Sequence, residues 1–244
     1  MQAIGVAEQT LLQAVDSALE IRRPASGFVV RPADPPKPVL LPPWFLDRCR
    51  QIYLSVTFDD VTRIIGVTSA LPEEGKTSVA IGVASAIASD TREPTLLLET
   101  AFEKPALARS LGIGPEGGLA EWLESGAQLR LARMPYLPQL VVMPSGAAHR
   151  DPARLLYRMS ESNVLGQLTQ RFRNIVLDLP SVLNVPYSSL AARLAERLVV
   201  VARHGVTNLD DLESVVFLLG RERVSGIVMN AADYRTPAWL RRLL

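Results

Sequence analysis

One stretch of this sequence constrains the fold more than any other: Ile64-Ile-Gly-Val-Thr-Ser-Ala-Leu-Pro-Glu-Glu-Gly-Lys-Thr-Ser78. Its apolar start predicts a buried strand, the following residues predict a tight loop, and Gly-Lys-Thr opens an Ala-rich helical pattern without proline up to Ala88. The N–H groups and the positive dipole end of such a helix favour an anion. The stretch therefore predicts a phosphate-binding loop.

Within this loop, Lys76 can place a positive charge on the β- and γ-phosphate oxygens, and the Thr77 hydroxyl can ligate Mg²⁺. The full motif has glycine five positions before Gly75, where this chain has Ala70. The prediction therefore depends on the strand and helix around the loop, and the alternative is an ordinary strand–turn–helix with a surface lysine. We expect ATP with Mg²⁺ as the ligand, bound by Glu74, Gly75, Lys76, Thr77 and Ser78.

Short apolar runs alternate with helical patterns along most of the chain. The predicted strands are Ile64–Val67, Thr95–Leu98, Leu140–Met143, Ile175–Leu177, Leu198–Val201 and Gly226–Met229. The predicted helices are 44–57, 77–89, 118–124, 153–172, 188–196 and 209–220. All-apolar strands alternating with helices are typical of a parallel sheet covered on both faces. The fold class is therefore α/β, with a doubly wound, mostly parallel sheet of the P-loop NTPase type.

The chain divides into four predicted segments. Residues 1–23 read as an amphipathic helix, which could dock onto another protein or be a frayed tail that packs weakly. Residues 24–43 form a linker with seven of the 18 prolines. Residues 44–234 make up the P-loop domain, and 235–244 a tail that contains Trp239-Leu-Arg-Arg-Leu-Leu244.

Composition limits the classes of function. The net charge of +1 argues against a large nucleic-acid interface. A single cysteine, Cys49, fits a reducing cytoplasm, and His149 and His204 lack metal-ligand spacing. No apolar run approaches the roughly 20 residues of a membrane span, and the N-terminus lacks a secretory pattern. We therefore expect a cytoplasmic protein with no transmembrane segment, which reaches the inner membrane only through a partner.

Polar residues follow three of the predicted strands. Asp178 ends Ile175-Val-Leu-Asp178, where a carboxylate can hold Mg²⁺ or can cap a turn before Pro180. Asn230 follows Gly226–Met229, where its amide can pair with an adenine edge or form a turn. Glu99 could reach a metal or an attacking nucleophile, or could be one charge at a helix start. The candidate catalytic residues are thus Lys76, Glu99 and Asp178, the candidate metal ligands are Thr77 and Asp178, and Asn230 joins the nucleotide-binding set.

The order of these motifs resembles the cytoplasmic ATPase domain of bacterial tyrosine kinases of capsule and exopolysaccharide synthesis. The phosphate loop is similar to the family's Thr-Ser-x-x-Pro-Gly-Glu-Gly-Lys-Ser. Leu97–Pro105 occupies the place of its second Walker motif, and Val176–Val182 that of its Walker B motif. Gly118–Gly126 and Pro144–Leu156 resemble connecting segments that separate this family from partition and septum-site ATPases. The resemblance implies ATP, Mg²⁺ and a membrane polysaccharide co-polymerase as partner.

The chain departs from the family pattern around the second Walker motif. Glu99 and Ala101 stand at its two aspartate positions, and Glu103 stands at its arginine. Losing one carboxylate and lengthening the other should damage phosphoryl transfer, because that chemistry is mostly positioning and electrostatics. Tyr187 stands at the family's aspartate after Walker B, and Glu73 replaces a loop glycine, so a special backbone angle is expected to be lost.

Two further departures concern assembly and phosphorylation. The family's oligomerisation motif, Glu-x-x-Arg-x-x-Arg, reads here as Asp47-x-x-Arg50-x-x-Tyr53, so a homo-oligomeric ring is not assured. The tyrosine-rich tail is missing. These departures favour an ATP-binding regulator of exopolysaccharide synthesis or export with weak or lost kinase activity. The alternatives are an active tyrosine kinase or ATPase of the same pathway, and a partition-type positioning ATPase.

Overall fold

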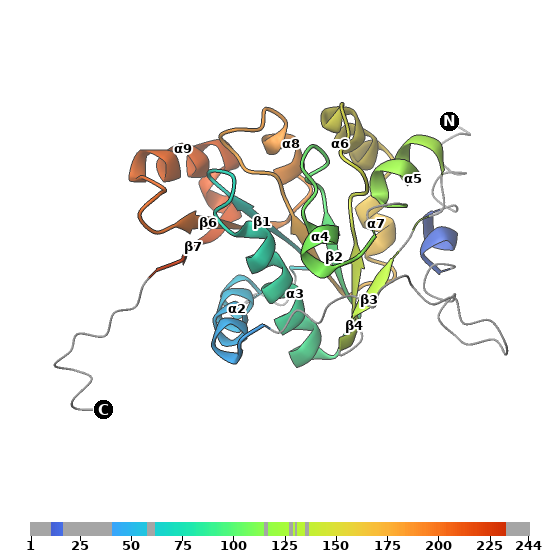
Figure 1. Cartoon of the computed structure of the whole chain (residues 1–244), viewed down its shortest axis with the longest axis horizontal. Helices are drawn as coiled ribbons and strands as arrows, with labels where there is room; N and C mark the ends of the chain where they lie inside the picture. Colours follow the sequence, from blue (N-terminus) through green and yellow to red (C-terminus); the bar gives the residue numbers. More distant parts are fainter. Residues whose placement is uncertain are drawn as a thin grey trace.

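The computed structural model describes residues 11–16, 41–57, 62–114, 117–126, 129, 131–134 and 137–232. Within these ranges the chain forms a seven-stranded sheet in the order β3-β4-β2-β5-β1-β6-β7 (Figure 1). The strands are β1 (Ile64–Ser69), β2 (Thr95–Glu99), β3 (Ala132–Met134), β4 (Leu137–Met143), β5 (Asn174–Asp178), β6 (Arg197–Arg203) and β7 (Val224–Asn230). All neighbours pair in parallel except β3 with β4. The predicted α/β, doubly wound and mostly parallel fold is confirmed.

Each of the six predicted apolar runs forms a strand, extended by a few residues at one or both ends. The strands β1, β2 and β5 are buried almost throughout, as expected for a sheet covered on both faces. Sequence analysis missed β3, which has three residues and a register shift against β4. A strand this short has no periodicity to recognise, and only pairing with β4 defines it.

Helices cover both faces of the sheet (Figure 1). They are α2 (Pro43–Val56), α3 (Lys76–Thr91), α4 (Leu107–Leu111), α5 (Leu119–Ser125), α6 (Pro152–Glu161), α7 (Val164–Leu168), α8 (Ser188–Ala192) and α9 (Leu209–Leu219), with a 3-10 turn, η1 (Arg221–Arg223). The apolar residues of α2, α3 and α4 pack into the core on one face. Those of α5 to α9 pack into the core on the other face.

The single helix predicted over 153–172 is wrong, because the chain forms two helices there, α6 and α7. The break lies at Asn163, whose φ of 49° is left-handed. Asparagine tolerates this conformation better than most residues with a side chain. The turn lets both helices bury apolar residues against the same face of the sheet.

Residues 11–16 of the predicted N-terminal helix are helical, and they pack on the chain's own core. Leu11 and Val15 are fully buried there. Asp16 accepts two hydrogen bonds from the Arg171 guanidinium, at 2.9 and 3.0 Å. This face of the segment is therefore not free to dock onto another protein; the rest of 1–23 and most of the predicted 24–43 linker lie outside the described residues.

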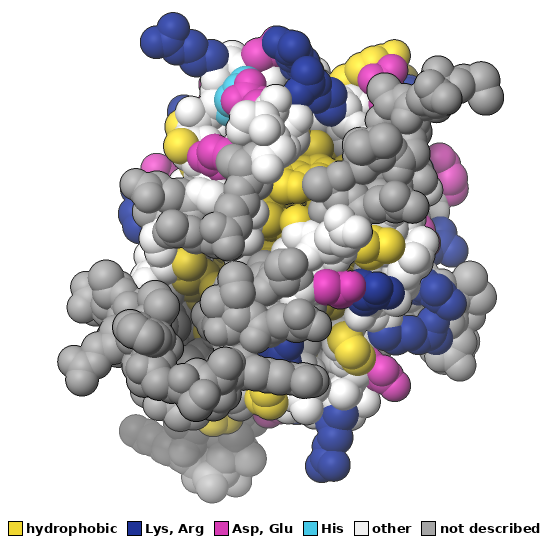
Figure 2. Space-filling view, turned by 90° about the vertical axis from the view of Figure 1, so that its right-hand side faces the viewer, with side chains coloured by type: hydrophobic (Ala, Val, Ile, Leu, Met, Phe, Trp, Pro, Cys, Tyr) yellow, Lys and Arg dark blue, Asp and Glu magenta, His cyan; other side chains and the backbone are white. Residues whose placement is uncertain are grey.

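Figure 2 shows the side of the molecule near β3, where acidic and basic side chains are interspersed and hydrophobic side chains are visible between them. Among the described helices, none combines the length and the apolar character that crossing a bilayer requires. The phosphate loop follows β1, while Glu99, Asp178 and Asn230 end β2, β5 and β7. The carboxyl ends of parallel strands share one edge of the sheet, so all the candidate residues lie along that edge.

Candidate functional site

The phosphate loop joins β1 to α3 as predicted. Gly75 directly precedes the helix with a φ of 93°, and Lys76 is the first helical residue. A Cβ at Gly75 would lie 2.1 Å from the Asn230 side-chain nitrogen, so both the backbone angle and the space require glycine. No described side chain caps the start of α3, and its first turn holds no acid. The free N–H groups of this 16-residue helix are therefore available to an anion.

Glu74 braces the loop from inside. Its buried carboxylate accepts a hydrogen bond from the Leu71 N–H at 2.8 Å and one from the Thr207 hydroxyl. Its carbonyl accepts a third, from the Asn230 side-chain amide, at 2.8 Å. The Glu74 side chain is therefore engaged within the protein, and its contact with the nucleotide stays a prediction.

Asn230 and Thr207 reach the loop from distant parts of the sequence. Asn230 ends β7, and Thr207 lies between β6 and α9. Sequence analysis placed Asn230 near the nucleotide but missed its bond to the loop, and it missed Thr207 altogether. Only the adjacency of β1, β6 and β7 carries this information, because a threonine in a loop has no distinctive sequence signal.

Glu73 keeps the left-handed backbone that the family's glycine would adopt, with a φ of 63°. The expected loss of this angle is therefore wrong. For a residue with a side chain, that conformation costs roughly 1–2 kcal/mol. The loop accepts this strain, so its geometry is imposed by the braces around it rather than by the residue at position 73.

Asp178 ends β5 and is fully buried. Neither of its carboxylate oxygens accepts a hydrogen bond of ordinary geometry from a described residue, although the Thr77 hydroxyl is near enough to favour the ionised form. Burial raises the pKa of Asp178 to about 7, and the nearby charge of Glu99 adds to the rise, while Lys76 and Thr77 lower it. A buried carboxylate without donors is costly unless a cation meets it. Together with Lys76 and Thr77, it is a set of groups that fits a metal-bound phosphate.

Glu99 ends β2 directly opposite Asp178 in register. One oxygen accepts from the N–H groups of Ala106 and Leu107, at 2.6 and 2.8 Å. The other accepts from the N–H and hydroxyl of Ser145, at 3.1 and 2.9 Å. These contacts tether the start of α4 and the loop after β4, and the catalytic role of Glu99 stays a prediction.

The other two departures of the second Walker motif differ in burial, since Ala101 is buried and Glu103 is exposed. Ala101 is buried and brings only a methyl group. Glu103 accepts a hydrogen bond from the Tyr187 hydroxyl at 3.2 Å. Burial, followed by the charge of Glu103, raises the pKa of Tyr187. Two positions that depart from the family pattern thus contact each other and link the segments that follow β2 and β5.

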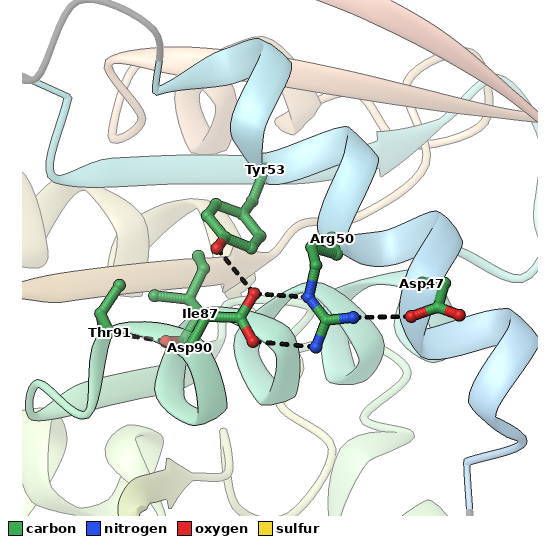
Figure 3. A network of polar contacts seen from close by, with 6 residues as sticks. All are labelled: Asp47, Arg50, Tyr53, Ile87, Asp90 and Thr91. Carbon is green, nitrogen blue, oxygen red and sulfur yellow. Dashed lines mark hydrogen bonds and ion pairs between the residues drawn. The ribbon is translucent and has the colours of Figure 1, made fainter.

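The residues of the expected oligomerisation motif form a cluster within the chain (Figure 3). The Arg50 guanidinium donates two hydrogen bonds to Asp90 at the end of α3, at 2.6 and 2.8 Å, and a third to Asp47, at 2.6 Å. The Tyr53 hydroxyl donates to the same Asp90 at 2.8 Å. These bonds, chiefly those of Arg50, hold the pKa of Asp90 below its usual range. The motif positions on α2 therefore clamp α3.

The two histidines take no part in a metal centre within the described structure. His149 pairs with Glu124 at 2.7 Å, and the described residues contain no group of three or more His, Cys, Asp or Glu placed to hold a metal ion. The only cation that the geometry of the described residues suggests is one that a phosphate would bring to Thr77 and Asp178.

Comparison with known proteins begins with a negative result: no protein-family model matches the chain. Its sequence is similar to several bacterial tyrosine kinases. CpsD of Streptococcus pneumoniae serotype 4 is 26% identical over 192 residues, covering 76% of this chain and 82% of CpsD. Ptk of Acinetobacter johnsonii is 24% identical over 170 residues, covering 68% of this chain and 23% of Ptk. The succinoglycan biosynthesis transport protein ExoP of Rhizobium meliloti is 26% identical over 178 residues, covering 70% of this chain and 22% of ExoP.

Solved structures agree with this similarity. The VpsO kinase domain has a TM-score of 0.68 and 27% identity, covering 78% of this chain and 97% of that domain. The kinase domain of Escherichia coli ETK also has a TM-score of 0.68, with 21% identity and 77% of each chain covered. The cell-division ATPase MinD of Pyrococcus furiosus has a TM-score of 0.58, with 21% identity, covering 71% of this chain and 75% of MinD.

The fold and the loop define a P-loop NTPase of the α/β type, with the strand–loop–helix unit of β1 and α3 at its centre. Among these solved structures, the two kinase domains align with a higher TM-score, 0.68, than the cell-division ATPase MinD, 0.58. The chain is similar in sequence to bacterial tyrosine kinases, and it shares the fold of their kinase domains. It spans about a quarter of the length of Ptk and ExoP, the longer relatives that it matches.

Proposed function

We propose that this chain binds ATP with Mg²⁺ and regulates exopolysaccharide or capsule synthesis, with weak or lost kinase activity. One observation carries the nucleotide part: a fully buried Asp178, without a hydrogen-bond donor among the described residues, lies beside Lys76 and Thr77 at the uncapped start of α3. A bare buried carboxylate and a row of free N–H groups are both unfavourable alone. A metal-bound triphosphate would satisfy both, because it presents a cation and an anion together.

Each candidate residue then has a distinct role. The N–H groups of the Gly75–Ser78 turn and the Lys76 ammonium hold phosphate oxygens. Thr77 and Asp178 hold Mg²⁺, which neutralises charge on the phosphates. Asn230 remains the candidate for the adenine edge: its nitrogen bonds to the loop, which leaves its side-chain oxygen to accept from a second partner.

Weak catalysis follows from the second Walker motif. Phosphoryl transfer needs carboxylates positioned at the metal and at the attacking hydroxyl. Both oxygens of Glu99 are bonded to the protein, and Ala101 has no carboxylate. The relatives named as tyrosine kinases favour the alternative of an active kinase or ATPase. A positioning ATPase is less favoured, because the MinD and ParA structures align with lower TM-scores than the kinase domains.

The pathway and the partner rest on the relatives alone. ExoP is named for succinoglycan biosynthesis and transport. By this similarity, the partner is a membrane polysaccharide co-polymerase of the chain-length-determinant type, and this cytoplasmic chain meets the inner membrane through it. A homo-oligomeric ring built on α2 would require the clamp of Asp47, Arg50 and Tyr53 to open, so we expect the chain not to assemble through these residues.

Nucleotide titration tests the core of the proposal. Lys76→Ala should weaken the affinity for a fluorescent ATP analogue about ten- to a hundredfold, because it removes charge-assisted bonds of about 1.5–3 kcal/mol each. Arg154→Ala is the matched control, since it removes an exposed charge from α6 on the other face. Two results would disprove the phosphate-loop assignment: no binding by the unmodified chain, or an affinity of Lys76→Ala equal to that of the unmodified chain and of Arg154→Ala.

Turnover separates the regulator from the active kinase. We expect ATP hydrolysis and tyrosine phosphorylation well below the range of about 1–100 per second that kinases reach. A rate within that range, measured by phosphate release with Mg²⁺ present, would establish the active kinase instead. Lys76→Ala provides the background rate of the same preparation.

A further inference from the structure

Strand β7 is largely exposed, although Val228 packs on the core that α2 and α3 cover. Within the described structure β7 pairs only with β6, and it lies at the outer edge of the sheet beside α2 (Figure 1). Between α2 and β7 lies a groove of about 800 Å³ with largely apolar walls, which include Trp44, Phe45, Ile52, Val79 and Val228.

The residues that directly follow β7 lie at this groove. Ala231 and Ala232, which follow β7, both line it. Ala231 has a φ of 53°, a conformation that turns the backbone sharply at the end of the strand. The last described residue, Ala232, therefore lies at the wall of the groove.

The sequence of that segment matches an apolar groove. Thr236 followed by Pro237 is a strong signal for the start of a helix. In a helix from there, Trp239, Leu240 and Leu243 fall on one face, and Arg241 and Arg242 fall mostly on the other. The seven residues that follow Ala232, up to and including Trp239, can span up to about 25 Å. The groove-lining part of β7, from Gly226 to Asn230, is only about 13 Å long at the usual rise per residue.

We propose that residues 236–244 of this chain dock in the α2–β7 groove, with Trp239, Leu240 and Leu243 turned toward its apolar wall. Docking of the chain's own segment is favoured over docking of a second copy, because the short connection to β7 holds the segment at a millimolar effective concentration. Docking in the groove is also favoured over binding to a lipid surface, since two arginines near anionic lipid add only about 1 kcal/mol each. The docked segment closes the groove to other proteins. It also adjoins Asn230, which holds the phosphate loop.

Cross-linking in the full chain tests this placement. Cys49 is the sole cysteine, so Cys49→Ser gives a background without other thiols. In that background, the pair Ile52→Cys and Leu240→Cys should form an intrachain disulfide at least tenfold faster than the control pair Tyr157→Cys and Leu240→Cys. Ile52 lines the groove, whereas Tyr157 is exposed on α6 over the opposite face.

Three results of the cross-linking would overturn the proposal: equal rates for both pairs, products that are mainly dimers, and loss of the intrachain product with pelleting on anionic phosphatidylserine vesicles. The last two would assign the segment to a second copy or to a membrane.

Hydrogen exchange gives an independent test without cysteines. The full-length triple variant Trp239→Ala, Leu240→Ala and Leu243→Ala should exchange amides of α2 and the outer edge of β7 at least fivefold faster than the unmodified chain. Amides of α6 should exchange equally in both proteins and serve as the internal control. Unchanged exchange in α2 and β7 would overturn the proposal.

Discussion

Glu99 and Asp178 end neighbouring strands, face each other in register and are both fully buried, yet their surroundings are opposite. Glu99 receives four hydrogen bonds from the protein, and Asp178 receives none within the described structure. A buried acid with all its donors is stabilised as part of the scaffold, whereas a buried carboxylate without donors is costly unless a cation pairs with it. The comparison teaches that burial and position at a strand end do not by themselves identify a catalytic acid.

Side-chain length explains why the two acids differ. Glu99 has one methylene more than the aspartate that the family has at this position, so its carboxylate reaches the start of α4 and Ser145. Asp178 is too short to leave the sheet edge. Glu99 is therefore held by the protein as a structural tether, and Asp178 is left beside Lys76.

Removing the Glu99 side chain should have the largest effect on the stability of the chain. Glu99→Ala leaves three buried N–H groups and a hydroxyl without their acceptor, and each unsatisfied group costs about 1–3 kcal/mol. We expect the free energy of unfolding to fall by about 3–5 kcal/mol, partly offset by relief of repulsion with Asp178. Urea denaturation measures it, with exposed Glu161→Ala as a control that should change little. A loss below about 1 kcal/mol would show that the tether contributes little.

The pH dependence of stability reports on Asp178. Its pKa is raised from 3.8 to about 7 by folding, so between these values the native state holds a proton that the unfolded state has lost. The free energy of unfolding should therefore fall as pH rises through that window, by at most about 1.4 kcal/mol per unit, and level off above it. Asp178→Asn should remove this slope, and Mg²⁺-ATP should flatten it. Identical pH profiles for the unmodified chain and Asp178→Asn would contradict the assigned pKa.

Restoring the family's acids should exchange stability for activity. In the double variant Glu99→Asp and Ala101→Asp, the shortened side chain at position 99 cannot reach both sets of donors, so we expect a loss of about 1–2 kcal/mol. The carboxylates released toward the site should raise ATP turnover. Ala101→Asp alone, which keeps Glu99, is the matched control and should raise turnover less. If the double variant is as stable as the unmodified chain, the length argument is wrong.

The smallest effect concerns the loop next to the two acids. Glu73→Gly should raise the free energy of unfolding by about 0.5–1 kcal/mol, because the strain at a φ of 63° exceeds the extra flexibility of glycine in the unfolded chain. Nucleotide affinity should stay unchanged, since the braces at Glu74 remain. Thermal unfolding and nucleotide titration of the same variant measure both. A lower stability would mean that Glu73 makes a stabilising contact in solution.

The sequence alone determined the strand–loop–helix unit of β1 and α3, six of the seven strands of the described sheet, and the α/β class. These features depend on local chemistry: a glycine with the angle that the loop needs, apolar runs that must be covered on both faces, and an Ala-rich helix directly after the loop. Asp178 and Asn230 were also placed correctly at strand ends, because a polar residue that follows an apolar run stands out. The boundaries shifted by a few residues, where pairing with a neighbour extended a strand.

Tertiary structure alone decided what the polar residues do. Glu74 faces Thr207, Glu99 faces Ser145, and Arg50 of α2 bonds to Asp90 of α3. In each case the partners are 40 or more residues apart, and no local pattern distinguishes an acid with donors from one without. The same holds for β3 and for the break at Asn163, which exist because a neighbouring strand and a shared core require them. Local sequence sets which groups are present, and the packing of distant elements sets which of them remain free to bind.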